Sequence, residues 1–303
     1  MKRILVTGSN GLLGQKLVYK LKDRTDVELI ATARGANRLV DQTGYLFRSM
    51  DIEDRQSVDT VIDTVKPHHI IHTAAMTQVD DCELDHAVCD RANVDAVQYI
   101  VNAAERNNSH LVHISTDFIF NGKEGPYDEQ GVADPLSYYG NAKWKGELIV
   151  QQSKLRWAIL RTVLVYGIVD NMSRSNIVLW AKGALEKGKP INVVDDQFRS
   201  PTLAEDLADG CILAVDHNAT GIYNISGKDQ FAIIDLVREV ADHYGLDKSL
   251  INPVSSETLN QPAKRPPVTG FILDKARREL GYEPHSFKEG MALMDAQIKA
   301  MKG

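Results

Sequence analysis

The sequence has little cysteine and no long apolar run. Its three cysteines, Cys82, Cys89 and Cys211, are an odd number among 303 residues, at spacings that do not match a metal site. Such sparse cysteine is typical of a reducing compartment, so we expect a cytoplasmic protein. No apolar run approaches the roughly 20 residues that a membrane-spanning helix needs, which predicts that the protein has no membrane partner.

The sequence also lacks any run of basic residues. Its net charge is −6, which argues against nucleic acid as a partner. The opening "MKRILVTGSNGLLG" has a basic start and a short apolar run, but no small-residue cleavage site follows. We therefore expect a first strand there, not a signal peptide. With 43% hydrophobic and 25% charged residues, the chain is long enough for one large or two modest folded domains.

Short apolar runs alternate with helical patterns along the first half of the chain. The runs are mostly unbroken, which is typical of strands buried on both faces of a parallel sheet. Helical stretches such as "LLGQKLVYKLKD" and "DAVQYIVNAAERNN" separate them. We therefore predict an α/β fold with a doubly wound parallel (Rossmann) sheet. The expected strands are residues 3–7, 28–32, 68–74, 110–115 and 157–161.

The regular alternation of apolar runs and helical patterns ends after Tyr166-Gly167. We expect a helix near 176–187, a strand at "INVV", a helix near 203–215 and a loop at the proline-rich residues 261–270. The predicted layout is a dinucleotide-binding domain over 1–165, to which the chain returns around 203–225. A smaller C-terminal α/β substrate-binding domain is expected to occupy most of 166–303.

A glycine-rich segment follows the first predicted strand directly and opens a helix. In "TGSNGLLG" the glycines are three apart, which allows a tight turn and close approach of the backbone to a pyrophosphate. The helix N-terminus adds N–H donors and positive dipole. A plain glycine-rich turn is the alternative, but the strand–turn–helix position favours dinucleotide binding. The predicted cofactor contacts are Gly8, Ser9, Asn10, Gly11, Leu12, Leu13 and Gly14.

The end of the second strand bears on which dinucleotide binds. A carboxylate there would favour NAD, whereas an arginine accommodates the 2′-phosphate of NADP. The chain reads "IATARGANR", with Arg34 where an aspartate would stand and Arg38 nearby. We therefore predict NADPH, with NADH as the alternative. Arg34 could also be a solvated loop charge.

The stretch "SYYGNAKWKGE" and the end of the fifth strand suggest a reductase site. Tyr139 and Lys143 are four apart and share one face of a helix, whereas Tyr138 would diverge from that lysine. A ketone reduced by hydride needs a proton on its oxygen, and a nearby ammonium makes tyrosine a better acid by lowering its pKa. Thr116, in "HISTDFIFNG", would hold the carbonyl oxygen at the carboxyl edge of the sheet, beside Asp117. Taken alone, "STD" could be a strand-end turn or cap.

With these motifs, the chain resembles the extended short-chain dehydrogenases/reductases along essentially its whole length. Within them it looks most like the dTDP-4-dehydrorhamnose reductase group. The matching segments are "TGSNGLLG", "HTAAMTQVDDCE", "NVDAV", "STDFIFNG", "PLSYYGNAKWKGE", "RTVLVYG", "DQFRSPTLAEDLA" and "AKRPPVTGFILDKARRELGY".

The resemblance implies roles for particular residues. Thr116, Tyr139 and Lys143 would be catalytic, the last two also touching the cofactor, and Thr116 and Asp117 would meet the substrate. The further cofactor residues implied are Asp51 and Ile52 beside the adenine, with Ala74, Ala75 and Thr77 lining the cleft.

Departures from the related enzymes refine this expectation. The 4,6-dehydratase relatives carry an Asp-Glu pair after the threonine, but here Phe118 follows Asp117, so dehydration is not expected. Arg199 stands where the reductase group usually has glycine. Arg199 and Arg265 resemble the arginines with which sugar-nucleotide epimerases bind a substrate diphosphate, and bidentate hydrogen bonds would suit that role. Arg199 as a surface charge is the alternative.

The sequence thus predicts a cytoplasmic NADPH-dependent reductase of the 4-keto group of a nucleotide-linked deoxysugar. Two alternatives stay open. One is another nucleotide-sugar epimerase or reductase, and the other is a non-catalytic binding protein like the regulatory β subunit of methionine adenosyltransferase. Relatives are commonly dimers, which implies a homodimer. No metal site is predicted, although assistance by Mg²⁺ stays open.

Overall fold

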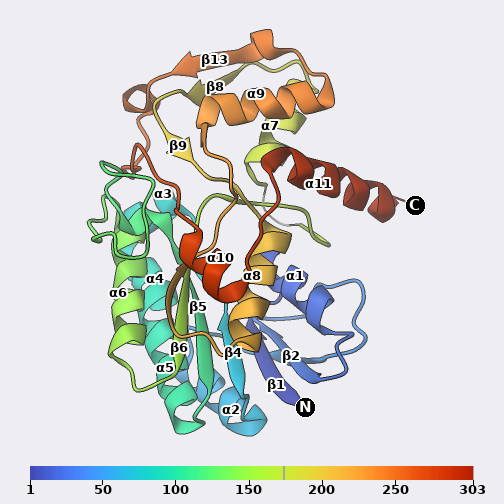
Figure 1. The fold of residues 1–303 in the computed structure, drawn as a ribbon, viewed down its shortest axis with the longest axis vertical. Helices are drawn as coiled ribbons and strands as arrows, with labels where there is room; N and C mark the ends of the chain where they lie inside the picture. Colours follow the sequence, from blue (N-terminus) through green and yellow to red (C-terminus); the bar gives the residue numbers. More distant parts are fainter. Residues whose placement is uncertain (173–174, 303) are drawn as a thin grey trace.

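The chain folds around a seven-stranded parallel sheet, and the computed structural model describes residues 1–172 and 175–302. The strands lie in the order β11-β6-β5-β4-β1-β2-β3 (Figure 1). The order runs outward from β1 in both directions, as in dinucleotide-binding folds, and the predicted fold class is confirmed. The strands are β1 (Lys2–Thr7), β2 (Val27–Ala33), β3 (Leu46–Ser49), β4 (His69–His72), β5 (His110–Thr116), β6 (Trp157–Thr162) and β11 (Gly221–Asn224).

Helices cover both faces of this sheet. Ile4 and Val6 of β1 pack in the core that contains α1 and α8, whereas Leu5 between them packs in the core beneath α2, α5 and α6. Alternate residues of a strand point to opposite faces, which is why strands buried on both sides are apolar throughout. The helices of the first face are α1 (Leu12–Leu21), α8 (Ala204–Asp216) and α10 (Asp274–Leu280), and those of the second are α2 (Arg55–Val65), α5 (Ala96–Arg106) and α6 (Tyr138–Gln152).

All five predicted sheet strands of the first half are present, within a few residues of their expected bounds. The short edge strand β3 was not predicted. Its sequence "LFRS" is mostly exposed and pairs only with β2 among the described strands, so it lacks the apolar run that marks an inner strand. Residues 176–187 form α7 (Ile177–Leu185), and the segment after Thr202 forms α8 as expected.

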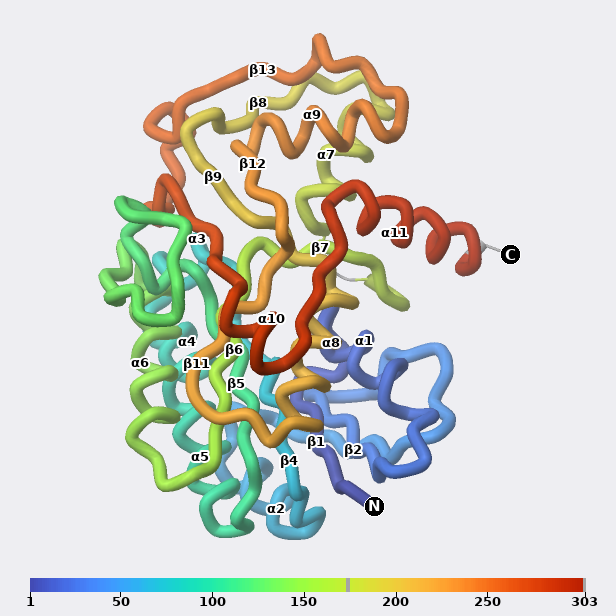
Figure 2. The backbone as a smooth tube through the Cα atoms, in the orientation of Figure 1, coloured from blue at the N-terminus to red at the C-terminus, as the bar shows by residue number. Residues whose placement is uncertain are grey.

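A second core lies beyond the carboxyl edge of the sheet (Figure 2). Strand β8 pairs in parallel with β13, and α7, α9 and α11 supply most of the apolar side chains. The domain boundary predicted at residue 165 stays a prediction. The elements of this region are β7 (Val165–Tyr166), β8 (Ile191–Val194), β9 (Phe198–Arg199), β10 (Thr202–Leu203), β12 (Phe231–Ala232), α9 (Ile233–Tyr244), η3 (Lys248–Leu250), β13 (Ile251–Val254), η4 (Ser256–Leu259) and α11 (Phe287–Lys302).

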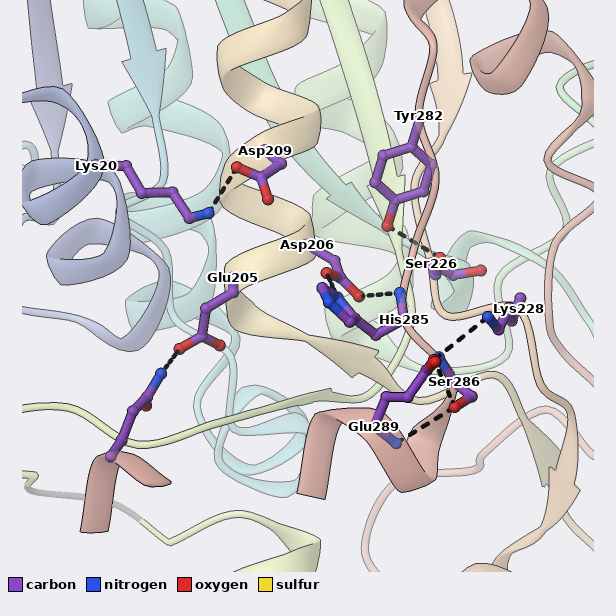
Figure 3. A network of polar contacts seen from close by, with 11 residues as sticks. Lys20, Glu205, Asp206, Asp209, Ser226, Lys228, Tyr282, His285, Ser286 and Glu289 are labelled. Atoms are coloured by element: carbon purple, nitrogen blue, oxygen red, sulfur yellow. Dashed lines mark hydrogen bonds and ion pairs between the residues drawn. The ribbon is translucent and has the colours of Figure 1, made fainter. Parts of the chain in front are cut away.

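Buried Asp206 on α8 ties the sheet region to the C-terminal segment (Figure 3). Its two carboxylate oxygens accept hydrogen bonds from the His285 backbone N–H, at 2.9 Å, and from His285 Nδ1, at 2.6 Å. Asp206 is only 2% exposed, so these bonds replace its water. One turn on, Asp209 pairs with Lys20 in a more open setting (Figure 3).

We expect Asp206→Ala to lower the free energy of unfolding by about 1–3 kcal/mol, since it removes two hydrogen bonds to a buried carboxylate. Asp209→Ala is the matched control on the same helix, and it should change stability by no more than about 0.5 kcal/mol. Urea titration followed by circular dichroism measures both. Equal losses in the two variants would contradict the anchoring role of Asp206.

Candidate active site

The glycine-rich segment forms a tight turn between β1 and α1. Gly8 has a φ of +69°, which favours glycine, and a Cβ on it would lie 2.9 Å from the Ala74 backbone. A Cβ on Gly14 would lie 2.2 Å from the Gly8 carbonyl oxygen. Among the described residues, no side chain caps the start of α1 at Gly11. The first N–H groups of α1 are therefore available to an anion, and the turn fits the pyrophosphate of a dinucleotide.

The segments around this turn hold it in place through short polar contacts. The Asn10 side chain accepts from the Arg38 N–H and donates to the Ala36 carbonyl, both at 2.9 Å. The N–H groups of Thr73 and Ala74 donate to Thr7 Oγ1, which places the segment after β4 beside the turn. Ala75 and Thr77 continue that segment.

Arg34 follows β2 directly and its side chain is 74% exposed. Its Nη1 lies 3.9 Å from the Asp51 carboxylate and 3.8 Å from that of Glu53. Asp51 and Ile52 follow β3, so the predicted adenine contacts lie close to Arg34. Arg34 is exposed, yet it lies among the predicted cofactor residues.

The three predicted catalytic residues are brought together at the carboxyl edge of the sheet. Thr116 ends β5, and Tyr139 and Lys143 lie on the first two turns of α6, with exposed fractions of 6%, 8% and 4%. Lys143 Nζ donates to the Ile114 carbonyl at 2.7 Å. Helix α6 begins at Tyr138 because Ser137 caps it, its Oγ accepting from the Gly140 N–H at 3.2 Å.

Burial dominates the electrostatics of this group. It raises the pKa of Tyr139 above its ordinary value, against a smaller lowering by the Thr116 hydroxyl. It lowers the pKa of Lys143 to about 8, while the Glu147 carboxylate opposes that change. The prediction that Lys143 lowers the Tyr139 pKa stays a prediction. The raised pKa keeps the Tyr139 hydroxyl protonated at neutral pH.

Tyr138 is directed elsewhere. Its hydroxyl donates to the Asp90 carboxylate at 2.7 Å, and its ring stacks on His86 with centroids 3.6 Å apart. Tyr139 packs instead among Cys82, Cys89 and Ala142. The sequence-based choice of Tyr139 over Tyr138 is consistent with this placement.

The predicted substrate arginines are both engaged with protein groups. Arg199 is 3% exposed, so its interpretation as a surface charge is wrong. Its guanidinium donates to the carbonyls of Phe198, Pro266 and Pro267, and its Nε lies 3.8 Å from the Asp117 carboxylate. Buried Asp117 also accepts a short hydrogen bond from Thr269. A diphosphate contact by Arg199 stays a prediction that requires these bonds to rearrange.

Burial lowers the pKa of Arg199 and the Asp117 carboxylate opposes this, while the nearby charge of Arg265 adds a smaller lowering. The Nη2 of Arg265 donates to the Asp80 carboxylate at 2.8 Å. The carboxylate of Asp80 therefore neutralises the charge of Arg265. The loop that carries Arg265 also contains Thr269, which bonds Asp117, the residue after Thr116. The two arginines predicted from separate motifs do lie together.

Sequence reasoning missed the role of Asn93. This residue is 1% exposed and its side chain bonds both the N–H and the carbonyl of Met76, at 3.0 and 2.9 Å. Its Nδ2 also contacts the sulfurs of Cys82 and Cys89. Asn93 lies in a π-helical turn, η1 (Arg91–Asp95), after the short helices α3 (Val79–Leu84) and α4 (His86–Asp90). The "NVDAV" motif can be recognised in the sequence, but only the tertiary structure shows that Asn93 bonds the Met76 backbone.

Residues 1–172 and 175–302 contain no cluster of three or more His, Cys, Asp or Glu side chains arranged to hold a metal ion. In the same residues, no helix combines the length and the apolar character that crossing a membrane requires.

Comparison with known proteins identifies the family. A profile described as the RmlD substrate binding domain matches residues 1–299. The chain belongs to this family. It is 31% identical to the dTDP-4-dehydrorhamnose reductase of Aggregatibacter actinomycetemcomitans, over 96% of this chain and 97% of that protein. It is 30% identical to methionine adenosyltransferase 2 subunit beta of Danio rerio, over 88% of this chain and 81% of that protein.

Solved structures give the same result. A dTDP-4-dehydrorhamnose reductase from Clostridium acetobutylicum superposes with a TM-score of 0.86 at 27% identity, covering 98% of this chain and 99% of that one. A dTDP-4-dehydrorhamnose reductase from Bacillus anthracis, in complex with NADP, superposes with a TM-score of 0.85 at 26% identity, covering 98% and 100%. The predicted resemblance to this reductase group is confirmed.

We expect Gly14→Ala to abolish detectable dinucleotide binding or to destabilise the protein, because its Cβ would lie 2.2 Å from a backbone oxygen. Gly183→Ala on α7 is the control, since nothing described lies within 4 Å of the Cβ it adds. That change should be neutral or stabilise by about 0.5–1 kcal/mol. NADPH fluorescence titration and thermal unfolding measure both variants. Normal NADPH binding by Gly14→Ala would refute the assignment of the glycine-rich turn as the dinucleotide site.

Proposed function

We propose that the protein is an NADPH-dependent reductase of the 4-keto group of a nucleotide-linked deoxysugar, as its dTDP-4-dehydrorhamnose reductase relatives are named. The observation that carries the proposal is that Thr116, Tyr139 and Lys143 are buried at the carboxyl edge of the sheet, the same edge at which the glycine turn follows β1. Family membership over residues 1–299 supports the substrate class.

The proposed roles follow from where each side chain lies. Bound NADPH supplies the hydride that adds to the carbonyl carbon. Tyr139, kept protonated by burial, donates its proton to the carbonyl oxygen, and Thr116 positions that oxygen by a hydrogen bond. Lys143, held by the Ile114 carbonyl, places a positive charge near the phenolate that forms.

NADPH is the proposed cofactor because Arg34 is a cation at the end of β2. Its guanidinium is exposed and its carboxylate neighbours are 3.8–3.9 Å away, so it can turn to a 2′-phosphate at little cost. The named NADP complex of a relative supports this choice. A cytoplasmic location, expected from the sparse cysteine, and a homodimer, implied by the resemblance, complete the proposal.

The decisive test follows NADPH oxidation at 340 nm with dTDP-4-dehydro-6-deoxy-L-mannose. Wild type should turn over, and Tyr139→Phe should lose about 10²–10⁴-fold in kcat because it removes the proton donor. Tyr138→Phe is the matched control and should keep its rate, since that hydroxyl bonds Asp90 instead. Running the assay with NADH tests the cofactor choice, and equal kcat/KM for both cofactors would oppose it.

A second function would be non-catalytic. The similarity to methionine adenosyltransferase 2 subunit beta supports a regulatory subunit as the alternative. Tight NADPH binding without turnover of any nucleotide sugar, together with a stoichiometric partner enzyme in pull-downs, would replace the reductase proposal with this one.

The rate of ketone reduction should depend on the charge of Lys143. Because burial lowers the pKa of that ammonium to about 8, kcat should be constant below this pH and fall as the pH rises through it. Measuring kcat from pH 6 to 10 at saturating NADPH checks the prediction. A rate unchanged up to pH 10 would show that the lysine charge does not limit the step.

A further inference from the structure

Four buried polar side chains lie together on the sheet face that α5 and α6 cover. Thr7 is opposite His72 in the β1–β4 pairing, and His72 is opposite His113 in the β4–β5 pairing. Ser115 follows His113 by two positions, so it points to the same face. Exposed fractions are 2% or less for all four. This group, Thr7, His72, His113 and Ser115, is called the histidine pocket below.

The hydrogen bonds of Thr7 determine the tautomer of His72. Thr7 Oγ1 accepts from two backbone N–H groups, so its own proton goes to His72 Nδ1, 2.8 Å away. His72 therefore carries its ring proton on Nε2. That Nε2–H has no hydrogen-bond partner in the described part of the chain, and neither do the two ring nitrogens of His113 or the hydroxyl of Ser115.

The imidazole rings of His72 and His113 do not hydrogen-bond to each other. They stack with centroids 5.4 Å apart and an angle of 28° between planes, a geometry in which ring nitrogens cannot exchange a hydrogen bond. Gly146 of α6 lies near His113, and even a Cβ there would be 3.7 Å from His113 Nε2. Buried donors and acceptors that converge in this way are normally bridged by ordered water.

Lys143 lies one turn before Gly146 on the same helix, and its ammonium bonds the Ile114 carbonyl between His113 and Ser115. We propose that ordered water held by the histidine pocket hydrates the Lys143 ammonium, and that His113 is a positioning residue that keeps this lysine charged. The part of the proposal that concerns catalysis rests on the reductase function proposed above.

The groups around Lys143 make this assignment consistent. Burial disfavours the charged ammonium of Lys143 and lowers its pKa, and Glu147 from α6 and Cys89 from α4 partly oppose this effect. Burial and the Lys143 charge lower the pKa of His72 to about 3 and hold that of His113 well below its ordinary value. Both histidines are therefore neutral at physiological pH. His72 offers its Nε2–H donor and His113 offers one ring acceptor and one donor, without adding positive charge.

The experiment measures the Lys143 titration directly by NMR of protein labelled with ¹³C at lysine Cε, with Lys143→Arg identifying the signal. His113→Leu removes both ring nitrogens at similar volume, and should lower the Lys143 pKa by about one pH unit, because the ammonium loses hydration. His113→Gln keeps polar groups in the pocket and should stay close to wild type. A Lys143 pKa that is unchanged in His113→Leu would overturn the proposal.

Ser115→Ala gives a second, smaller perturbation that keeps the proposal testable if His113→Leu does not fold. It should lower the Lys143 pKa in the same direction, and an unchanged value would count against the pocket. In wild type, water-to-ring nuclear Overhauser contacts at the His72 Nε2–H should be present, and their absence in an assigned spectrum would exclude the water.

These readouts need no substrate, so they separate the two proposals. If wild type does not reduce nucleotide sugars, the function proposed above fails while the titration still decides the role of His113. If wild type turns over, the alkaline limb of kcat should move to lower pH in His113→Leu and stay in place in His113→Gln. If His113→Leu lowers the Lys143 pKa but leaves the alkaline limb of kcat in place, only the proposed effect of His113 on catalysis is refuted.

Discussion

The site depends on one hydrogen bond between two elements that are distant in sequence, from Lys143 Nζ on α6 to the Ile114 carbonyl at the end of β5. It connects the helix that carries Tyr139 to the strand that ends in Thr116. A buried ammonium needs such a partner because desolvation otherwise makes the charge expensive. The same contact therefore holds Lys143 against the strand that ends in Thr116, while burial shifts the pKa values of Tyr139 and Lys143.

Other buried charges around the site are paired in the same way. Arg161 and Glu147 are 2% and 0% exposed and meet in a bidentate contact at 3.0 and 2.8 Å. Asp117 lies against Arg199, whose other donors meet backbone carbonyls. A buried pair adds little net stability, but removal of one partner leaves an isolated charge. Such pairs therefore fix geometry, here joining α6 to β6 and β9 to the residue that follows β5.

Much of the fold was visible in the sequence. Apolar runs separated by amphipathic helices predicted the parallel sheet, because strands buried on both faces must be apolar throughout. The glycine turn was predicted from spacing, since three regularly spaced glycines between a strand and a helix are typical of a phosphate-binding turn. The exposed edge strand β3 was missed, because its sequence carries no comparable apolar run.

The sequence by itself determined the fold class and the candidates Thr116, Tyr139 and Lys143, since strand alternation and helical spacing are local rules. Tertiary structure decided what surrounds them. It buried Arg199 against Asp117, joined Asn93 to Met76, and stacked His72 on His113 beneath Lys143. Those contacts join segments that are not adjacent in the chain, and burial, which shifts each pKa, exists only once the sheet and helices have packed.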